Sequence, residues 1–179
     1  MSDVHTLMDA PSPWVARWAH CIPAGARVLD VACGHGRHAR YFAARGHVVD
    51  AVDRNTEALA SLADVANVTP CCADIEGGVW PYAPGTFAGV VVTNYLHRAL
   101  FAQLLDALAP GGVLIYETFA LGNARFGRPS NPDFLLKRGE LLEVVRGRLQ
   151  VHAYEDLVLE APRPACVQRI CAGHATNTP

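Results

Sequence analysis

The chain has 179 residues, of which 51% are apolar and 18% are charged, and its formal net charge is −2. A chain of this length can bury the core of one α/β domain without disulfides or a metal ion, and its composition excludes a disordered protein. The near-neutral charge gives no general attraction to nucleic acid or to anionic lipid, so neither is expected as a partner.

Segments with helical periodicity alternate with short apolar stretches along the chain. The segments predicted to be helices are 12–22, 37–45, 55–66, 98–109 and 138–147. The stretches predicted to be strands are 27–32, 47–53, 68–74, 86–96, 112–120, 149–160 and 165–175. Ser12 and Asn55 stand where helix N-caps are expected, and Gly46 stands where the second helix should end.

The order of these elements predicts the fold class. Strands that alternate with helices form a mostly parallel sheet with helices on both faces, here a Rossmann-like, doubly wound α/β sheet. The last two strands are separated only by 161–164, without a helix, so we expect them to form an antiparallel pair. We predict one domain over 1–179, with an N-terminal helical segment in 1–25.

Two further parts complete this predicted domain. Residues 26–120 form a cofactor-binding half, and residues 121–179 supply a substrate loop and the antiparallel strands, with a frayed tail from Thr176. The sequence has no run of eighteen apolar residues and no signal-peptide pattern, so we expect a cytoplasmic protein without a membrane partner.

Cysteine and histidine spacing does not favour a metal site. The six cysteines form no Cys-x-x-Cys pair, and we interpret them as small apolar residues rather than as metal ligands or disulfides. His35 and His38 are three residues apart, but no third ligand lies near them in the sequence. We therefore predict no metal ion.

The stretch "VLDVACGHGRHA", residues 28–39, leads from a predicted strand through a glycine loop into a helix. Gly34 and Gly36 allow the backbone to approach a ligand closely, and the loop's N–H groups and the helix N-terminus face the point where ligands bind in open α/β sheets. Dinucleotides, S-adenosylmethionine and plain tight turns all use such a loop, so the motif alone leaves these three alternatives open.

Three acids follow three successive predicted strands, at the same edge of the sheet. A carboxylate at Asp30 would repel a pyrophosphate but would suit a cationic amine. Asp53 lies at the distance expected for an acid that binds ribose hydroxyls, and Asp74 can accept a hydrogen bond from an adenine amino group. The amine, ribose and adenine of S-adenosylmethionine match the three acids in order, although Asp74 could also be a solvated surface acid.

These residues carry a resemblance to a known family. Residues 28–55, "VLDVACGHGRHARYFAARGHVVDAVDRN", resemble the cofactor-binding half of class I S-adenosylmethionine-dependent methyltransferases. The stretch "FLLKRGELLEVV" (134–145) with the later "YED" is similar to the small bacterial branch related to tellurite-resistance methyltransferases. The resemblance implies a seven-stranded sheet with an antiparallel last strand, and S-adenosylmethionine as the cofactor.

The resemblance also implies a set of site residues. Asp53 would hold the ribose, Asp74 the adenine, and the loop glycines would contact the methionine portion. Ala32 replaces the first glycine of the family's loop, which could weaken cofactor binding. The candidate cofactor-binding residues are Asp30, Ala32, Cys33, Gly34, His35, Gly36, Asp53, Arg54, Asp74, Ile75 and Thr93.

The substrate side is predicted at the ends of the fourth and fifth strands. The segment 93–97, "TNYLH", lacks the Asn-Pro-Pro-Tyr pattern of adenine and glutamine N-methyltransferases and contributes Tyr95 as a candidate substrate contact. His97 could act as a general base, cap the next helix or simply pack. Arg163 falls where the tellurite-resistance relatives carry a His-Arg pair implicated in substrate activation, but here Pro162 precedes it.

A long loop without periodicity, 121–138, follows the fifth predicted strand. Arg125 and Arg128 could clamp an anionic substrate, and Phe126 and Phe134 could exclude water from it. The alternative is a solvated cover whose arginines are incidental.

Three functional hypotheses follow from the sequence. The first is a methyltransferase that acts on a small-molecule acceptor, anionic or bearing a thiol or another chalcogen. The second is an RNA or protein methyltransferase that works with a partner. The third is an NAD-dependent or non-catalytic nucleotide-binding domain, against which Asp30 and Asp74 argue.

Overall fold

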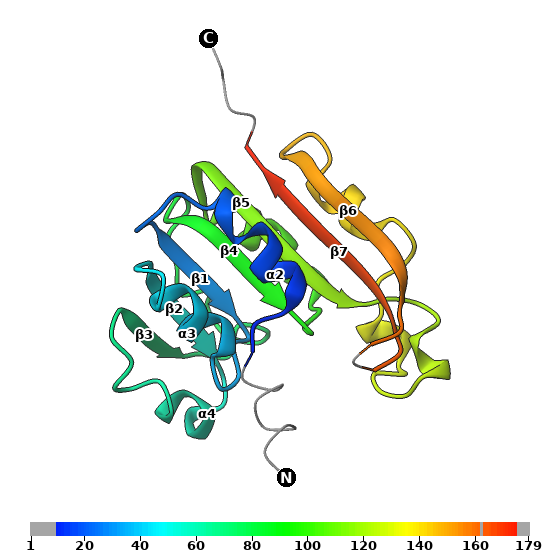
Figure 1. The fold of residues 1–179 in the computed structure, drawn as a ribbon, viewed down its shortest axis with the longest axis horizontal. Coiled ribbons are helices and arrows are strands. Elements are labelled where there is room, and N and C mark those ends of the chain that lie inside the picture. Colours follow the sequence, from blue (N-terminus) through cyan, green and yellow to red (C-terminus); the bar gives the residue numbers. More distant parts are fainter. Residues whose placement is uncertain (1–9, 162, 175–179) are drawn as a thin grey trace.

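The computed structural model describes residues 10–161 and 163–174, so the expected fraying from Thr176 lies outside the described residues. Seven strands form one sheet in the order β3-β2-β1-β4-β5-β7-β6 (Figure 1). The strands are β1 (Arg27–Val31), β2 (Val48–Asp53), β3 (Val68–Cys72), β4 (Phe87–Thr93), β5 (Leu108–Phe119), β6 (Gln150–Leu159) and β7 (Ala165–Gly173).

The direction of the strands confirms the predicted fold class. All neighbours from β3 to β5 pair in parallel, whereas β7 is antiparallel to both β5 and β6. The chain first builds β1, β2 and β3 outward to one side and then returns to place β4 on the other side of β1. Strand order therefore reverses between β1 and β4, which is where ligands bind in open α/β sheets.

Helices cover both faces of the sheet. They are α2 (Pro13–Trp18), α3 (Arg37–Ala43), α4 (Thr56–Ala60), α5 (Phe101–Asp106) and α6 (Glu140–Val145). Trp14, Phe42 and Leu62 belong to one buried apolar cluster, on the face of the sheet that α2 and α3 cover, in front of the sheet in Figure 1. Leu104 and Leu141 belong to the second cluster, under α5 and α6. In the described ranges, no helix has the length and apolar content that crossing a membrane requires.

The predicted helix starts are confirmed by their hydrogen bonds. The Ser12 hydroxyl oxygen accepts from the backbone N–H of Trp14 at 3.1 Å. The Asn55 side chain accepts from the N–H groups of Glu57 and Ala58, at 3.0 and 3.1 Å. These contacts satisfy donors that a helix start leaves free.

The predicted helix 98–109 is too long. The structure has a 3₁₀ turn, η2 (Arg98–Leu100), followed by α5, and Leu108 already pairs with Phe87 as the first residue of β5. Leu108 is buried, so its pairing with β4 replaces the last helical turn. The predicted fourth strand was likewise too long, because β4 ends at Thr93 and Asn94 turns the chain with a φ of 54°.

The segment 121–138 is not entirely a surface loop. It contains two 3₁₀ turns, η3 (Asn123–Arg125) and η4 (Pro132–Phe134). Leu135 and Leu136 after them are fully buried, and Leu136 forms a β-bridge with Ala120. Two adjacent leucines in a segment without periodicity gave no sign that tertiary contacts would bury both.

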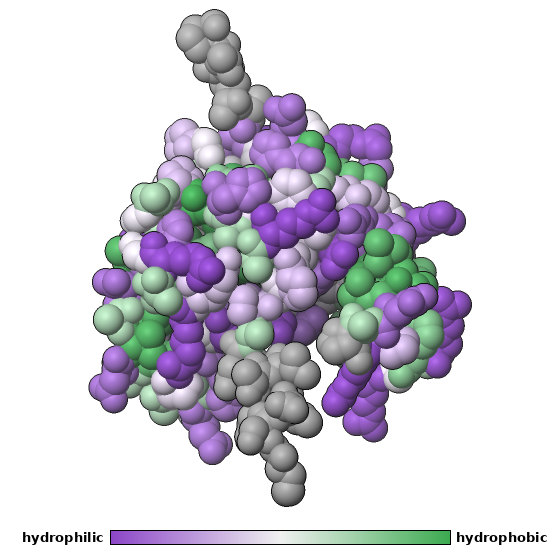
Figure 2. Space-filling view, viewed as in Figure 1, coloured by the Kyte–Doolittle hydropathy of each residue, from purple (hydrophilic) through white to green (hydrophobic). Residues whose placement is uncertain are grey.

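Apolar side chains gather at the end of the β6–β7 hairpin on the face shown in Figure 2. The exposed apolar residues of this part of the chain are Leu157 and Val158. Val158 pairs with Cys166, whose carbonyl accepts from the N–H of Ala120 at 2.9 Å. This apolar surface therefore borders the start of the loop that follows β5.

Candidate functional site

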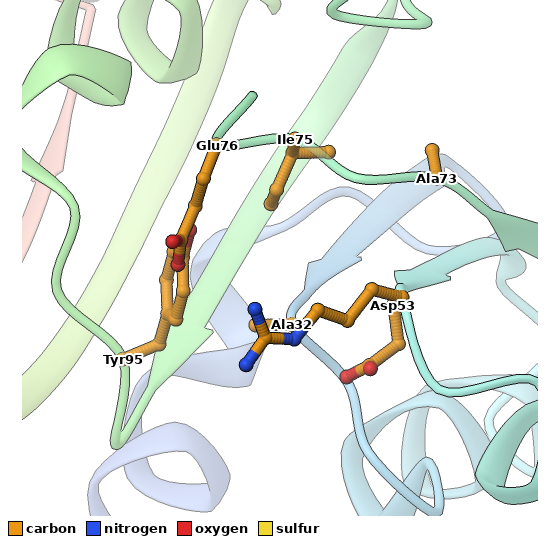
Figure 3. Close-up of a pocket in the computed structure, with 7 residues that line it drawn as sticks. Ala32, Asp53, Ala73, Ile75, Glu76 and Tyr95 are labelled. Atoms are coloured by element: carbon orange, nitrogen blue, oxygen red, sulfur yellow. The ribbon is translucent and has the colours of Figure 1, made fainter. Parts of the chain in front are cut away.

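A small cavity lies at the carboxyl ends of the strands, beside the point where strand order reverses. Its volume is about 110 Å³, and it is lined by Ala32, Asp53, Arg54, Ala73, Ile75, Glu76 and Tyr95. Figure 3 shows Asp53 on one side of the cavity, with Glu76 and Tyr95 on the other. Pockets that enclose a drug-sized ligand measure about 300–1,000 Å³, so this cavity can enclose only part of such a molecule.

The loop after β1 turns through three residues with positive φ. The φ angles are 51° at Ala32, 54° at Gly34 and 73° at Gly36. A Cβ on Gly36 would lie 2.5 Å from the Cδ1 atom of Leu62, so both packing and conformation require glycine there. Ala32 adopts a conformation that favours glycine, which is the residue the resembling family has at this position.

Asp53 ends β2 and connects the loop to the cavity. Its Oδ2 accepts from the N–H of Gly34 and its Oδ1 from the N–H of Asn55, both at 2.8 Å. A carboxylate has about four lone-pair sites, so acceptor capacity is left for the hydroxyls of a ligand. Asp53 is half-buried and lines the cavity together with the exposed Arg54, and both were predicted as site residues.

Tyr95 brings a hydroxyl group without a protein partner to the cavity. The Tyr95 oxygen is buried and forms no hydrogen bond of normal geometry with a described residue, although the Glu76 side chain lies beside it (Figure 3). Burial, with the charge of Glu76 nearby, raises the pKa of Tyr95, so the hydroxyl keeps its proton. Sequence analysis missed Glu76, although an acid two residues beyond the predicted strand-end acid Asp74 was a usable signal.

Asp74 itself does not line the cavity. Its Oδ1 accepts from the N–H groups of Glu76 and Gly77, at 3.0 and 3.1 Å. These bonds, with that of Gly77 the stronger, lower the pKa of Asp74. The exposed carboxylate thus closes its own turn, whereas its neighbours Ala73 and Ile75 face the cavity.

Asp30 lies behind the loop rather than in the cavity. It is 1% exposed, and its Oδ2 accepts from the N–H of Ala39 in the first turn of α3 at 3.0 Å. Burial raises the pKa of Asp30 to about 7, although the Ala39 hydrogen bond acts in the opposite direction. The acid predicted to meet a cationic amine is therefore a buried residue that also holds the start of α3.

The remaining loop and strand-end candidates lie outside the cavity lining. Cys33 is half-buried, and burial raises the pKa of its thiol, so it keeps its proton. His35 is exposed, while Thr93 is half-buried with its hydroxyl 3.4 Å from His38 Nδ1. His97 precedes η2 without forming a side-chain capping bond, so the capping alternative is wrong.

The candidate substrate arginines do not converge on the cavity. Arg125, Arg128 and Arg163 are all exposed, and the nearest polar partner of Arg125 is Cys166 Sγ at 3.7 Å. Phe126 and Phe134 are 40% and 55% exposed, and neither lines the cavity.

Arg98, which sequence analysis missed, anchors the segment between Phe134 and α6. It donates to both oxygens of Glu140, at 2.7 and 3.0 Å, and to the carbonyls of Asp133 and Leu135, at 2.7 and 2.9 Å. In the part of the chain that the structure describes, no group of three His, Cys, Asp or Glu side chains could hold a metal ion.

Comparisons with known proteins agree with this geometry. Residues 28–112 match a family model described as a methyltransferase domain, and a search of curated proteins found no match. TehB from Haemophilus influenzae has a TM-score of 0.75 at 18% identity, over 92% of this chain and 62% of that chain. This chain therefore spans less than two thirds of the Haemophilus protein.

Two further solved structures share the fold. One is a TehB-like SAM-dependent methyltransferase from Corynebacterium glutamicum, with a TM-score of 0.67 at 18% identity over 95% of this chain and 92% of that chain. The other is 1,6-didemethyltoxoflavin-N1-methyltransferase from Burkholderia thailandensis, solved with 1,6-didemethyltoxoflavin and S-adenosylhomocysteine bound. Its TM-score is 0.70 at 20% identity, over 97% of this chain and 81% of that chain.

Changing Ala32 to glycine should raise the free energy of unfolding by about 0.5–1 kcal/mol. The relief of left-handed strain, about 1–2 kcal/mol, exceeds the entropy that glycine adds to the unfolded chain, about 0.4–1 kcal/mol. Urea unfolding measures the difference. As a matched control, Ala44→Gly, exposed at a φ of −62° after α3, should lower stability by about 0.5–1 kcal/mol. A loss of stability in both variants would show that Ala32 is unstrained.

Asp30 should make stability fall as pH rises. Its pKa in the folded protein, about 7, lies above its ordinary value, so folding favours the protonated acid. The contribution of Asp30 to the free energy of unfolding is complete below about pH 4. It is lost as the pH rises from about 4 to 7, at up to about 1.4 kcal/mol per pH unit. Urea unfolding from pH 5 to 8 should show this decline relative to Asp30→Asn, which stays neutral. Parallel curves for the two proteins would contradict a raised pKa.

Proposed function

We propose that the chain is a class I S-adenosylmethionine-dependent methyltransferase that transfers the methyl group to a small-molecule acceptor, and the match of residues 28–112 to a methyltransferase domain supports this proposal. The observation that carries the proposed site is the convergence of the glycine loop, Asp53 and the unpartnered Tyr95 hydroxyl on one cavity. Bound S-adenosylmethionine supplies an electrophilic methyl group on a positive sulfonium.

The cavity residues suit the adenosine portion of this cofactor. Asp53 has acceptor capacity for the ribose hydroxyls, because its two protein hydrogen bonds leave lone pairs free. Ile75 and Ala73 offer an apolar wall for the adenine ring. The orphaned Tyr95 hydroxyl would gain a polar partner from the ligand, which removes the free-energy cost of an unpaired buried group.

The two predicted acids outside the cavity lining, Asp30 and Asp74, are less direct contacts to the cofactor in this proposal. Asp30 is buried behind the loop, so it would act on the cofactor's ammonium without direct contact, and the ammonium would in turn favour the ionised form of this acid. Asp74 has a free Oδ2 because both of its turn bonds use Oδ1, but it lies outside the cavity lining. Glu76 already lines the cavity, so it is the better placed acid for an adenine amino group.

The proposed acceptor is an anionic small molecule. Transfer from a sulfonium is an in-line displacement, so the protein has chiefly to position and desolvate the nucleophile. A carboxylate, thiolate or chalcogen oxyanion would not need His97 as a base. The near-neutral charge of the chain also favours a small acceptor over RNA, and the Burkholderia methyltransferase provides a structural neighbour with such a molecule bound.

Arg125 and Arg128 are the proposed electrostatic contacts to this acceptor. Both leave the sheet in the loop that follows the carboxyl end of β5, and neither forms an ion pair with a described residue. Tyr95 and Arg163 are further candidates at the same edge. The division into a cofactor half (26–120) and an acceptor half (121–179) stays a prediction.

Asp53→Ala should weaken S-adenosylhomocysteine binding ten- to hundred-fold, about 1.4–2.8 kcal/mol, because the ribose hydroxyls lose their acceptor. Calorimetry on the purified protein measures the affinity, and NAD and NADP should give no heat. Asp64→Ala, at an exposed acid in the turn between α4 and β3, should leave binding unchanged. Equal affinity in the two variants, or tight NAD binding, would overturn the assignment of this cavity.

Exchanging both Arg125 and Arg128 for Gln should raise the KM for an anionic acceptor. Cofactor affinity should stay within about two-fold of the wild-type value, which is a change in binding free energy below roughly 0.4 kcal/mol. The acceptor panel consists of thiols, small carboxylates, selenite and tellurite. Methyl transfer to each acceptor is measured with labelled S-adenosylmethionine. The matched control exchanges Arg45 and Arg146, two exposed arginines outside the loop. If turnover of every methylated acceptor is the same in both double variants, the loop has no role in acceptor binding.

A further inference from the structure

A buried chain of hydrogen bonds reaches the end of β4 from the start of α2. Ser12 donates its backbone N–H to His38 Nε2 at 3.1 Å and its hydroxyl to Glu117 Oε1 at 2.6 Å. His38 Nδ1 lies 3.4 Å from Thr93 Oγ1. Ser12, His38 and Glu117 are 3%, 2% and 9% exposed, so water does not compete for these contacts.

The direction of the bonds at Ser12 is fixed by groups that can only donate. Arg169 Nη1 donates to Glu117 Oε2 at 3.2 Å, so the Glu117 carboxylate is the acceptor at this end of the chain of bonds. The Ser12 hydroxyl must therefore donate to Glu117, while the N–H of Trp14 donates to the Ser12 oxygen. The backbone N–H of Ser12 is then directed at His38.

This arrangement fixes the tautomer of His38. A backbone N–H can only donate, so His38 Nε2 must be without a proton. Burial lowers the pKa of His38 to about 3, so the ring is neutral and carries its single proton on Nδ1. That N–H points to Thr93 Oγ1, which accepts it. The proton of the Thr93 hydroxyl must therefore be directed at another group.

Thr93 lies where its hydroxyl can donate a hydrogen bond to a ligand. It is the last residue of β4, one position after the pairing of Val92 with Val31 at the end of β1. It thus stands at the reversal of strand order, on the side of β1 opposite Asp53. If Asp53 binds the ribose, the portion of the cofactor that extends across β1 toward Thr93 is the methionine portion, with its carboxylate.

We propose that the Thr93 hydroxyl donates a hydrogen bond to the carboxylate of the cofactor's methionine portion, and that His38 is the positioning residue that holds this hydroxyl as a donor. The inference rests on the proposed function, since it takes S-adenosylmethionine along the same rim. Without the His38 N–H, the hydroxyl could rotate and present its oxygen, whose lone pairs repel a carboxylate.

Two ligands distinguish a contact to the methionine carboxylate from binding at the cofactor site as a whole. S-Adenosylhomocysteine carries the carboxylate, whereas 5′-methylthioadenosine keeps the adenosine and the sulfur without the amino-acid portion. Calorimetry should show Thr93→Val binding S-adenosylhomocysteine about ten-fold more weakly and 5′-methylthioadenosine within two-fold of the unchanged protein. Thr93→Ser, which keeps the hydroxyl, should bind both ligands normally.

Variants of His38 test the positioning role. His38→Gln can accept from Ser12 with its carbonyl and donate to Thr93 with its amide, so it should retain affinity for S-adenosylhomocysteine. His38→Leu should lose about as much as Thr93→Val and, like it, spare 5′-methylthioadenosine. Long-range ¹H–¹⁵N correlation spectra of labelled protein should show the His38 proton on Nδ1 at pH 7. A proton on Nε2 would overturn the argument even if His38→Leu fails to fold.

Other outcomes have distinct meanings. Equal loss of both ligands in Thr93→Val would contradict the inference, because it would indicate a general disturbance of the site. Unchanged S-adenosylhomocysteine affinity with a raised KM for an anionic acceptor would also overturn it, because the hydroxyl would then serve the acceptor. Failure of the unchanged protein to bind either ligand would instead refute the proposed cofactor site.

Discussion

Between Val31 and Arg37 the chain passes from the end of β1 into α3 through three residues with positive φ. This turn brings the start of α3 to the reversal of strand order, and its own N–H groups bond within the protein, Cys33 to the Val52 carbonyl and Gly34 to Asp53. Two carboxylates hold it, Asp53 through Gly34 and Asp30 through Ala39. The cavity, the buried acid and the polar chain through His38 all depend on this turn, because each uses a residue that it positions.

The same turn holds two acids, Asp30 and Asp53, in opposite environments. Asp30 is enclosed, so burial outweighs its one hydrogen bond and raises its pKa. Asp53 is half-buried and accepts two backbone N–H bonds while it stays open to the cavity. The open acid has acceptor capacity left, whereas the buried one holds the start of α3.

Polar contacts also tie the N-terminal helix to the C-terminal strands. Arg169 on β7 bonds Glu117 on β5 and Glu155 on β6, and its guanidinium stacks over the Trp14 ring at 4.8 Å. Glu117 in turn receives the Ser12 hydroxyl. Removing a partner from such a buried set leaves an uncompensated charge, so these strands and α2 stabilise one arrangement together. These contacts hold β6 and β7 to β5 and α2.

The sequence by itself determined the features that depend on near neighbours in the chain. Apolar runs located all seven strands, capping residues located helix starts at Ser12 and Asn55, and the missing helix before β7 predicted its antiparallel direction. The glycine loop and Asp53 were also readable, because a turn with positive φ and an acid at a strand end have local signatures.

Only the tertiary structure decided which side chains share a space. Asp74 and Glu76 are two residues apart, yet the first closes its own turn and the second lines the cavity. Leu135 and Leu136 became core, and His38 became the link between Ser12 and Thr93. Each of these outcomes is set by contacts between residues distant in sequence or by competition with backbone donors. Periodicity and spacing carry no information about either.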